Sequence, residues 1–406
     1  MRVLLSTIGS RGDVQPLVAL ALQLRSLGQE VHLCVPPDFR DWIDSLGISV
    51  TPIGPELSKA TASSPSATSA PPSPERRRQL AEATVATQFE IIAAAAQGCH
   101  VIVGATALQI AARSVAEVMG IPYVFVAYCP VVLPSLHHAP PPLSPPGHPY
   151  APATVDNHEL WVRNAERFND TFGSSLNSHR ASVGLPAVSD VQSHIFTDSP
   201  WLAADPTLAP WPDPANQTVF QTGAWILPDE RPLPAELETF LDTGEPPVYF
   251  GFGSMNVPQN LSQVIVQTAR ALGHRAIVSR GWANLSLVSD SPDCLVIGEV
   301  NQQELFKRVT AVVHHGGAGT TTAAARAGIP QVVIPQIYDQ HYWAQRIHHL
   351  GIGTAHASGT PTTDSLTNAL EHTLQPDIAA RAQSIATAVR SDGAQTAAQC
   401  LMDAVS

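Results

Sequence analysis

The chain has few charged side chains, fewer basic than acidic ones and no long apolar run, and each shortage excludes a class of protein. Charged residues make up 14% of the 406 residues, with 22 Lys and Arg against 34 Asp and Glu. A net charge of −12 argues against nucleic acid or an anionic membrane surface as the main partner. No stretch approaches the ~20 apolar residues of a membrane-spanning helix, so we expect no stable membrane insertion.

The cysteines are few and scattered, and none forms a C-x-x-C pair. Their odd number and irregular spacing predict reduced side chains in a cytoplasmic protein rather than a disulfide framework. The five residues are Cys34, Cys99, Cys129, Cys294 and Cys400. The apolar run at the N-terminus is too short for the core of a signal peptide, which also favours a cytoplasmic location.

The sequence also lacks a D-x-D pair of carboxylates that could hold a divalent cation. Three histidines fall in the proline-rich stretch 130–152, but no carboxylate or thiolate accompanies them at a metal-ligating spacing. We therefore expect no bound metal and no cofactor. The stretch itself holds too much proline for regular structure, and its length is typical of a binding loop.

Apolar residues, by contrast, are plentiful. They make up 44% of the chain, and 406 residues exceed one ordinary core, so two domains are expected. Short apolar segments alternate with helical ones in both halves, which predicts an α/β protein with parallel sheets and right-handed crossovers. We place a first domain at residues 1–205, a linker at 206–232, a second domain at 233–390 and a final helix at 391–406.

The expected elements follow from this alternation. The strands are predicted at residues 2–7, 30–35, 48–53, 100–103, 123–127 and 202–204, then at 248–251, 276–279, 295–297, 311–313 and 331–334. The helices are predicted at 16–27, 36–46, 76–96, 108–119 and 158–183, then at 257–272, 302–307, 323–327, 342–350, 364–374, 377–390 and 394–405. Loops are expected at 8–15 and 59–75. Doubly wound sheets of this kind bind ligands beyond the carboxyl ends of their strands.

The turn after residues 311–313 carries the clearest functional pattern, HHGGAGTTT. Gly317 and Gly319 let backbone N–H groups approach an anion, and the helix that follows adds the positive end of its dipole. The imidazole of His315 and the hydroxyl of Thr320 can donate to the same oxyanion. The pattern predicts a phosphate site; the alternative is an ordinary turn in which Thr320 caps the helix.

This segment, followed by Pro335, Gln336, Asp339 and Gln340, resembles the nucleotide-sugar glycosyltransferases of the two-domain GT-B fold. The resemblance is strongest to bacterial natural-product enzymes of the vancomycin-group glycopeptide type, and sterol glucosyltransferases are more distant. It extends along the chain through LNSHR, GLP and AADP to the junction segment QTGAWILPDERPLPAEL. The resemblance implies two Rossmann-like, doubly wound domains facing across a cleft, with the final helix crossing back to the first domain.

On this resemblance the second domain binds the donor, a nucleoside diphosphate sugar. Ser254, in the glycine-rich segment GFGS, can donate to the distal phosphate beside the turn already described. Asp339 and Gln340 would take several sugar hydroxyls, since a carboxylate accepts while an amide both donates and accepts. Helix capping by Asp339 is the alternative.

The nucleoside would lie at the far end of the donor site. Val300 stands where plant members of the family carry a stacking tryptophan, so only its backbone is expected to contact the base edge. Trp282 is expected to line the base pocket, with a place in the apolar core as the alternative. The expected nucleoside contacts are Trp282, Val300 and Gln303.

Asp13 is the candidate catalytic residue. It follows the first strand in GSRGDVQP and holds the place before Pro16 where related plant enzymes carry a histidine base. A carboxylate there can accept or orient the proton of an acceptor hydroxyl. Capping of the following helix is an alternative that is compatible with this role. Acceptor contacts are expected from Gly12, Pro134 and His137.

The expected function is that of an inverting, metal-independent glycosyltransferase. It would move a sugar, a hexose by expectation, from a UDP- or dTDP-sugar to a hydroxyl of a natural-product or lipid-like small-molecule acceptor. Two other functions stay open: a non-catalytic sugar-nucleotide-binding partner protein, and a GT-B-type epimerase that acts on the donor alone. A monomer or weak dimer is expected.

Overall fold

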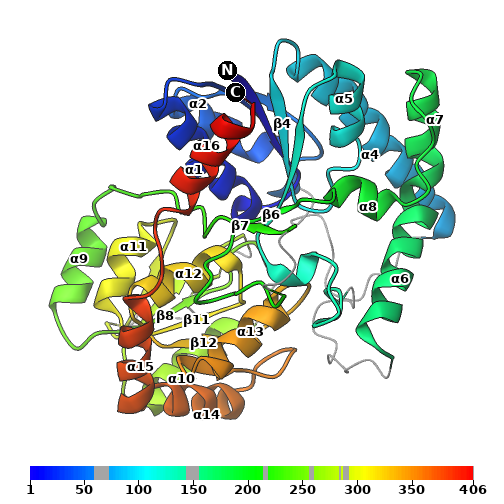
Figure 1. Cartoon of the computed structure of the whole chain (residues 1–406). Coiled ribbons are helices and arrows are strands. Elements are labelled where there is room, and N and C mark those ends of the chain that lie inside the picture. The colour runs from blue at the N-terminus through cyan, green and yellow to red at the C-terminus, as the bar shows by residue number, and fades with distance from the viewer. Residues whose placement is uncertain are drawn as a thin grey trace.

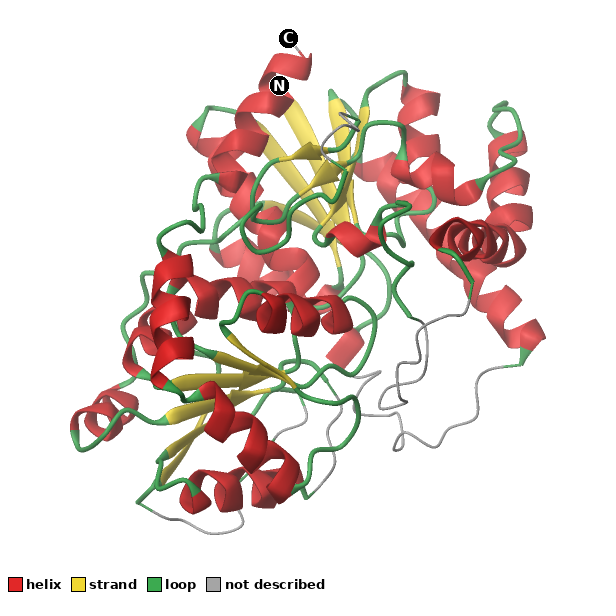
Figure 2. Cartoon of the chain, turned by 60° about the horizontal axis from the view of Figure 1, so that its bottom comes forward, coloured by secondary structure: helices red, strands yellow, loops and turns green. Residues whose placement is uncertain are grey.

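The structure, a computed structural model, describes residues 1–58, 73–142, 155–213, 218–255, 260–282, 285–286 and 292–405. Two parallel sheets form two domains, each with helices packed around its sheet (Figures 1 and 2). The α/β, GT-B-like architecture predicted from the sequence is confirmed. Most of the predicted loop at 59–75 and the second half of the proline-rich loop at 130–152 lie outside the described residues.

The first sheet has seven strands in the order β3-β2-β1-β4-β5-β6-β7, all parallel. The strands are β1 (Arg2–Thr7), β2 (Glu30–Val35), β3 (Ser49–Pro52), β4 (Val101–Ala105), β5 (Tyr123–Ala127), β6 (Trp201–Leu202) and β7 (Phe220–Gln221). The helices are α1 (Arg11–Ser26), α2 (Arg40–Ser45), α4 (Pro74–Ala95), α5 (Ala112–Met119), α6 (Asn157–Phe168), α7 (Ser174–Ser182) and α8 (Val191–Phe196), with short 3₁₀ turns at Pro37–Phe39 and Pro130–Val132. The sequence order of the strands changes direction between β1 and β4, so a ligand crevice is expected there.

The second sheet has six strands in the order β10-β9-β8-β11-β12-β13, again all parallel. They are β8 (Val248–Gly251), β9 (Ala276–Ser279), β10 (Cys294–Ile297), β11 (Ala311–His314), β12 (Gln331–Val333) and β13 (Gly353–Ala355). The helices are α9 (Ala235–Asp242), α10 (Leu261–Ala271), α11 (Gln302–Leu305), α12 (Ala318–Arg326), α13 (Gln340–His349), α14 (Thr363–Thr373) and α15 (Pro376–Ala386), with a 3₁₀ turn at Phe306–Arg308. Its switch point lies between β8 and β11.

Helices α1 and α12, which lie beside candidate site residues, each begin five residues before the predicted start. Helix α1 begins at Arg11, five residues before the predicted start, because Ser10 and Asp13 form a capping box and Pro16 is accommodated inside the helix. Helix α12 begins at Ala318, so the three threonines lie inside it, and Gly317 is the N-cap residue. The alternative interpretation, in which Thr320 caps this helix, is therefore excluded.

Other boundaries also differ. The helix expected over 158–183 is interrupted by a π-helical turn at Asn169–Gly173, and the one expected at 108 begins at Ala112. Strands β7 and β13 were not predicted, because segments of two and three residues carry no readable apolar pattern. Strand β7 lies within the predicted linker 206–232 and pairs with β6 of the first sheet.

The last helix, α16 (Gly393–Val405), lies beside α1 of the first domain, near both chain termini (Figure 1). Its buried residues Ala397, Ala398 and Leu401 belong to the same core as strands β1, β2 and β4. The segment before it is held by Asp205, a buried carboxylate that accepts the Arg390 N–H at 2.8 Å. The chain thus returns from the second domain to the first.

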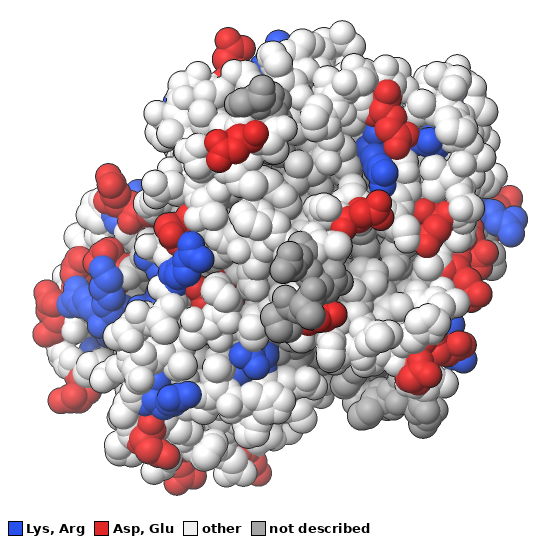
Figure 3. All heavy atoms as spheres, in the orientation of Figure 1, with Lys and Arg blue, Asp and Glu red and all other residues white. Residues whose placement is uncertain are grey.

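The cores are apolar and the surface is sparingly charged. Figure 3 shows one face on which acidic and basic side chains are scattered among a large uncharged area, in keeping with a charged content of 14%. Among the described residues, the helices include none that is both long and apolar enough to span a bilayer.

Candidate functional site

The candidate residues of the second domain follow its two central strands. Gly251 at the end of β8 lies beside His314 at the end of β11 in the parallel register. The turn with Ser254 follows β8, and the turn from His315 to Gly317 follows β11. Both turns therefore border the crevice at the switch point of this sheet, where doubly wound folds bind ligands.

The His315 ring fills the space between the two turns. Its Cε1 atom lies 3.0 Å from the position that a Cβ of Gly253 would take, and its Nε2 lies 2.8 Å from the corresponding position at Gly317. Gly253 has φ of 56°, a left-handed conformation that favours glycine. Burial lowers the pKa of His315 to about 4, against a smaller opposite effect of the Gly251 backbone. His315 is therefore neutral at pH 7 and faces the start of α12.

The start of α12 is free to bind an anion. Its N-cap residue Gly317 makes no side-chain cap, and the hydroxyls of Thr321 and Thr322 bond back to carbonyls of the same helix. The half-buried Thr320 hydroxyl makes no hydrogen bond to any residue that the structure describes. Unpaired N–H groups, the helix dipole and this hydroxyl together match a phosphate.

Asp339 lies at the N-cap position of α13, but its carboxylate does not cap the helix. It accepts a hydrogen bond from Trp343 Nε1 at 3.1 Å. Burial is the main cause that raises the pKa of Asp339 to about 7, with a smaller contribution from the negative charge of Asp13, whereas the Trp343 hydrogen bond lowers it. The preceding residue, Tyr338, has φ of 55°, a conformation that a non-glycine residue rarely adopts and that is common at functional sites.

Gln340 is buried, and its side chain is engaged by its own loop. Its Oε1 accepts the backbone N–H groups of Gln336 at 2.8 Å and Ile337 at 3.1 Å, and its Nε2 donates to Met255 Sδ at 3.4 Å. The Gln340 side-chain oxygen, which was predicted to bind a sugar hydroxyl, thus already accepts two hydrogen bonds from its own loop. Gln340 shapes the loop that presents Asp339.

The three residues predicted to contact the nucleoside lie in different surroundings. The Trp282 backbone N–H donates to the Gly253 carbonyl at 2.9 Å, which joins the turn after β9 to the turn after β8, while its ring packs against the first-domain core. Val300 packs partly into the second-domain core, and Gln303 Nε2 donates to the Leu227 carbonyl at 2.7 Å. The Gln303 amide nitrogen, which was predicted to contact the nucleoside, therefore connects the second domain to the linker instead.

Asp13 lies in the first turn of α1, at the switch point of the first sheet. Its Oδ2 accepts the Ser10 N–H at 2.7 Å and the Ser10 hydroxyl at 3.3 Å, and its carbonyl accepts the Tyr128 hydroxyl at 3.0 Å. Ser10, not Asp13, is the N-cap residue. A Cβ at Gly9 would overlap the Asp13 carboxylate, so glycine is required there. Burial raises the pKa of Asp13 to about 6, although both Ser10 contacts lower it.

The two carboxylates belong to different domains and lie close enough to interact. The charge of Asp13 raises the pKa of Asp339, and the charge of Asp339 raises that of Cys129, just after β5. Asp339 of the second domain thus faces the first domain. Within the described part of the chain, no three His, Cys, Asp or Glu side chains are grouped as a metal site.

The predicted acceptor residues are all exposed. Gly12 lies on the outer side of the first turn of α1, and Pro134 and His137 lie in the proline-rich loop. The loop is anchored by the neighbouring His138, whose carbonyl accepts Trp161 Nε1 at 2.9 Å and whose ring lies edge-on to that indole. His137 is exposed, and its backbone N–H donates to Ser135 Oγ at 3.1 Å.

Several site residues were not found from the sequence. Ser10 and Gly9 position Asp13, and Trp343 positions Asp339. The spacing S-x-x-D at Ser10 was a readable signal, because it is the pattern of a capping box. The Trp343 contact carried no such signal, since it depends on how α13 packs.

Comparison with protein families divides the chain in the same way as the two sheets. Residues 3–136 match the family described as "Glycosyltransferase family 28 N-terminal domain". Residues 263–399 match the family described as "Erythromycin biosynthesis protein CIII-like, C-terminal domain". The two matched segments contain Asp13 and the turn after β11, respectively.

Curated proteins give full-length matches. "Vancomycin aglycone glucosyltransferase" of Amycolatopsis orientalis is 50% identical over 408 residues, covering 100% of this chain and 98% of that protein. "dTDP-epi-vancosaminyltransferase" of the same organism is 44% identical over 414 residues, with the same coverage. "Sterol 3-beta-glucosyltransferase" of Arabidopsis thaliana is 27% identical over 424 residues, covering 97% of this chain and 63% of that protein.

Solved structures share the fold at lower identity. The glycotransferase of kitacinnamycin has a TM-score of 0.73 at 18% identity, covering 100% of this chain and 98% of that chain. The glycosyltransferase VinC, solved with dTDP, has a TM-score of 0.67 at 20% identity, covering 99% of each chain. From the full-length identity of 50% and the shared fold, this chain belongs to the GT-B glycosyltransferases, in the group of vancomycin-type glycopeptide enzymes.

Proposed function

We propose that this enzyme is an inverting glycosyltransferase that needs no metal ion and no cofactor. It transfers a hexose from a UDP- or dTDP-sugar to a hydroxyl of a glycopeptide-like aglycone. The observation that carries the proposal is the pairing of an anion site at the start of α12 with a buried carboxylate, Asp13, from the other domain. The names of the relatives, two of which are a glucosyltransferase and a dTDP-sugar transferase, support the choice of donor.

The donor diphosphate lies at the start of α12. Backbone N–H groups of Gly317 and Gly319, the hydroxyls of Thr320 and Ser254, and His315 hold its oxygens. When the sugar–phosphate bond breaks, negative charge grows on the departing diphosphate. The helix dipole and these donors stabilise that charge, which is the work a metal ion does in other transferases.

The acceptor hydroxyl attacks from the first domain. Asp13 accepts its proton as the new bond forms, and Asp339 holds the sugar hydroxyls on the opposite side of the cleft. Because nucleophile and leaving group lie on opposite domains, attack from the face opposite the diphosphate inverts the anomeric centre. The nucleoside lies beside Trp282 and the backbone of Val300.

The test is a reaction panel. Purified enzyme would be given UDP-glucose or a dTDP-sugar together with phenolic peptide aglycones or sterols, with and without EDTA. The expected result is a glycoside of inverted configuration, seen by mass and by the anomeric proton coupling in NMR, with unchanged yield in EDTA. Activity lost in EDTA and restored by Mg²⁺ or Mn²⁺ would overturn the metal-free mechanism.

The two other functions are tested in the same panel. UDP-glucose without acceptor should be left intact; an epimerised sugar in this sample would favour the epimerase. A donor that binds tightly but is never transferred to any acceptor, by enzyme whose Asp13 is intact, would favour a non-catalytic partner protein.

A further inference from the structure

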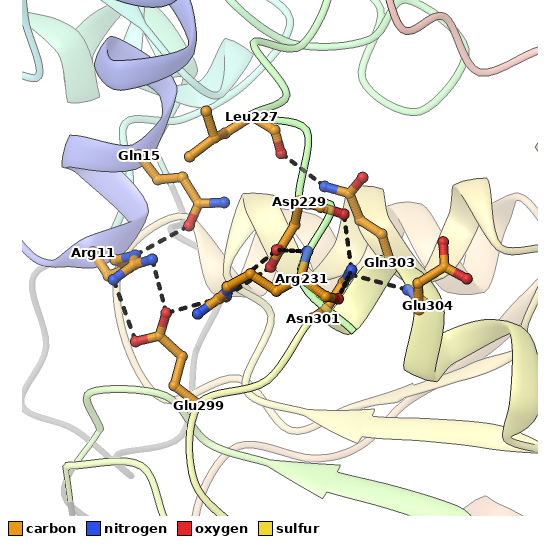
Figure 4. Close-up of polar contacts among 9 residues, drawn as sticks. All are labelled: Arg11, Gln15, Leu227, Asp229, Arg231, Glu299, Asn301, Gln303 and Glu304. Carbon is orange, nitrogen blue, oxygen red and sulfur yellow. Dashed lines mark hydrogen bonds and ion pairs between the residues drawn. The ribbon is translucent and has the colours of Figure 1, made fainter. Parts of the chain in front are cut away.

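An ion pair joins the two domains beside the site. Arg11, in the first turn of α1, meets Glu299 of the donor domain at 2.8 Å and 3.3 Å, through two separate nitrogen–oxygen contacts (Figure 4). Glu299 directly precedes Val300 in the loop between β10 and α11. The contact therefore connects the first turn that carries Asp13 to the loop expected to meet the nucleoside.

The Arg11 side of the contact is held by its own domain. Its guanidinium lies 3.8 Å from the ring centroid of Trp42, a cation–π arrangement, and its Nε donates to Gln15 Oε1 at 3.3 Å. The side chain is about a third exposed. Arg11 is thus oriented before Glu299 reaches it, and little side-chain freedom remains to be lost when the pair forms.

The Glu299 side is held through the linker. Arg231 lies 3.5 Å from Glu299 and pairs with Asp229 at 2.7 Å. Asn301 Nδ2 donates to the carbonyls of both Asp229 and Arg231, at 2.8 Å and 2.9 Å, and Figure 4 shows these side chains converging on one short stretch of linker. The loop that carries Glu299 is therefore fixed to the linker, and a movement of one moves the other.

We propose that Glu299 is a positioning residue, which through Arg11 fixes the first turn of α1 and so sets where Asp13 stands relative to the donor domain. This inference rests on the proposed function, in which Asp13 accepts the acceptor proton. A general base must lie within hydrogen-bond reach of its proton, and a shift of about 1 Å can cost ~100-fold in rate. Glu299 and Arg11 do not touch the substrates in this assignment.

The test compares Glu299→Gln, Arg11→Gln and the double variant with the wild type. Glu304→Gln is the matched control, because Glu304 forms an exposed ion pair with Lys307 in the same domain. We expect Glu299→Gln to lower kcat about tenfold, with the Kd for free UDP or dTDP and the melting temperature nearly unchanged. The double variant should lose no more than the worse single variant, since both remove one contact.

The salt dependence of kcat is a readout that a merely structural role would not change, and hydrogen exchange reports directly on the order of the first turn of α1. Raising NaCl from about 0.05 M to about 0.5 M should lower wild-type kcat and leave that of Glu299→Gln unchanged, because a partly exposed pair is screened. Amide exchange in the first turn of α1 should be faster in Glu299→Gln than in Glu304→Gln. This measurement needs no turnover.

Three outcomes would overturn the inference: wild-type kcat in Glu299→Gln, an equal loss in Glu304→Gln, or additive losses in the double variant. Asp13→Asn, measured in the same assay, distinguishes a failure of the positioning role from a failure of the proposed function. If Asp13→Asn is inactive while Glu299→Gln keeps full turnover, only the positioning role fails. If Asp13→Asn keeps turnover, the assignment of the base fails and the inference fails with it.

Discussion

Asp13, the proposed base, has an oriented carboxylate and a raised pKa, the two properties that this role requires. The Ser10 contacts orient one carboxylate oxygen, and burial holds the pKa at about 6, so the group is ionised at neutral pH yet more basic than an ordinary carboxylate. A general base is most effective when its pKa lies near the working pH. The same residue forms the capping box, so its structural role is compatible with the proposed catalytic role.

Replacing Asp13 by Asn should separate these roles. The amide retains the shape and much of the capping ability but cannot take a proton, so turnover should fall by ~10²–10⁴ with stability changed by less than ~1 kcal/mol. UDP affinity should barely move, because the phosphate site lies in the other domain. Asp13→Ala should in addition lose ~1 kcal/mol of stability. Turnover, titration with UDP and melting curves check this. Near wild-type turnover in Asp13→Asn would exclude Asp13 as the base and point to Asp339 or to a histidine of the proline-rich loop such as His137.

The pKa of Asp13 predicts the pH profile. Only the ionised carboxylate accepts a proton, so kcat/KM should fall about tenfold per pH unit below about 6 and level off above it. Between 3.8 and about 6 the native state keeps a proton that the unfolded chain has lost, so this group lowers stability as pH rises through that window. Asp339→Asn is the control, since it should keep the limb near pH 6. A profile of kcat/KM that stays flat to about pH 5 would contradict the ionised-base role.

Thr320 tests the phosphate site. Its free hydroxyl in the first turn of α12 should make one charge-assisted hydrogen bond to the diphosphate, worth about 1.5–3 kcal/mol. Thr320→Val should weaken UDP or dTDP binding by that amount in isothermal titration. Thr322→Val is the matched control, because that hydroxyl already bonds to the Ala318 carbonyl. Equal affinities of Thr320→Val and wild type would remove Thr320 from the site.

At the scale of elements, the start of α1 depends on a small residue before it. A Cβ at Gly9 would overlap the Asp13 carboxylate, so Gly9→Ala must displace either that side chain or the turn. We expect turnover to fall at least tenfold, in the way a misplaced catalytic group does. Gly173→Ala is the control, since its Cβ would meet nothing closer than 3.9 Å. A normal rate in Gly9→Ala would show that the carboxylate position is not critical.

Each doubly wound sheet brings its functional turns to one edge. In both domains the candidate residues follow the strands that flank the switch point, β1 in the first sheet and β8 with β11 in the second. The parallel register places those strand ends side by side, and the glycines keep the turns narrow enough for His315 and Asp13 to fit. The position of the site therefore follows from the order of the strands, and a few glycines leave room for its side chains.

At the scale of the whole molecule, α16 ties the domains together. Leu401 is fully buried in the first-domain core although it follows the whole second domain in sequence. Leu401→Ala should cost about 2–5 kcal/mol and lower the melting temperature. Gln399→Ala, on the exposed side of the same helix, should change it little. If the two variants melt at the same temperature, the packing of α16 does not stabilise the first domain.

The α/β class, the two sheets and most strand positions could be predicted from the amino-acid sequence, because buried parallel strands appear as short apolar runs between helices. It also pointed to Asp13 and to the turn at His315, since residues that follow a strand at a glycine-rich turn can be recognised locally. The start of α1 was predicted wrongly, because the capping pair Ser10 and Asp13 begins the helix before Pro16, which the helix accommodates.

Which polar side chains are already hydrogen-bonded within the protein became visible from the packing of the domains. Gln340 and Gln303 carry the right chemistry, but packing commits one to its own loop and the other to the linker. The pairing of Arg11 with Glu299 and the interaction of Asp13 with Asp339 join residues about three hundred positions apart. No local pattern encodes such contacts, because they depend on how the two domains meet and on the burial that this meeting imposes on each charge.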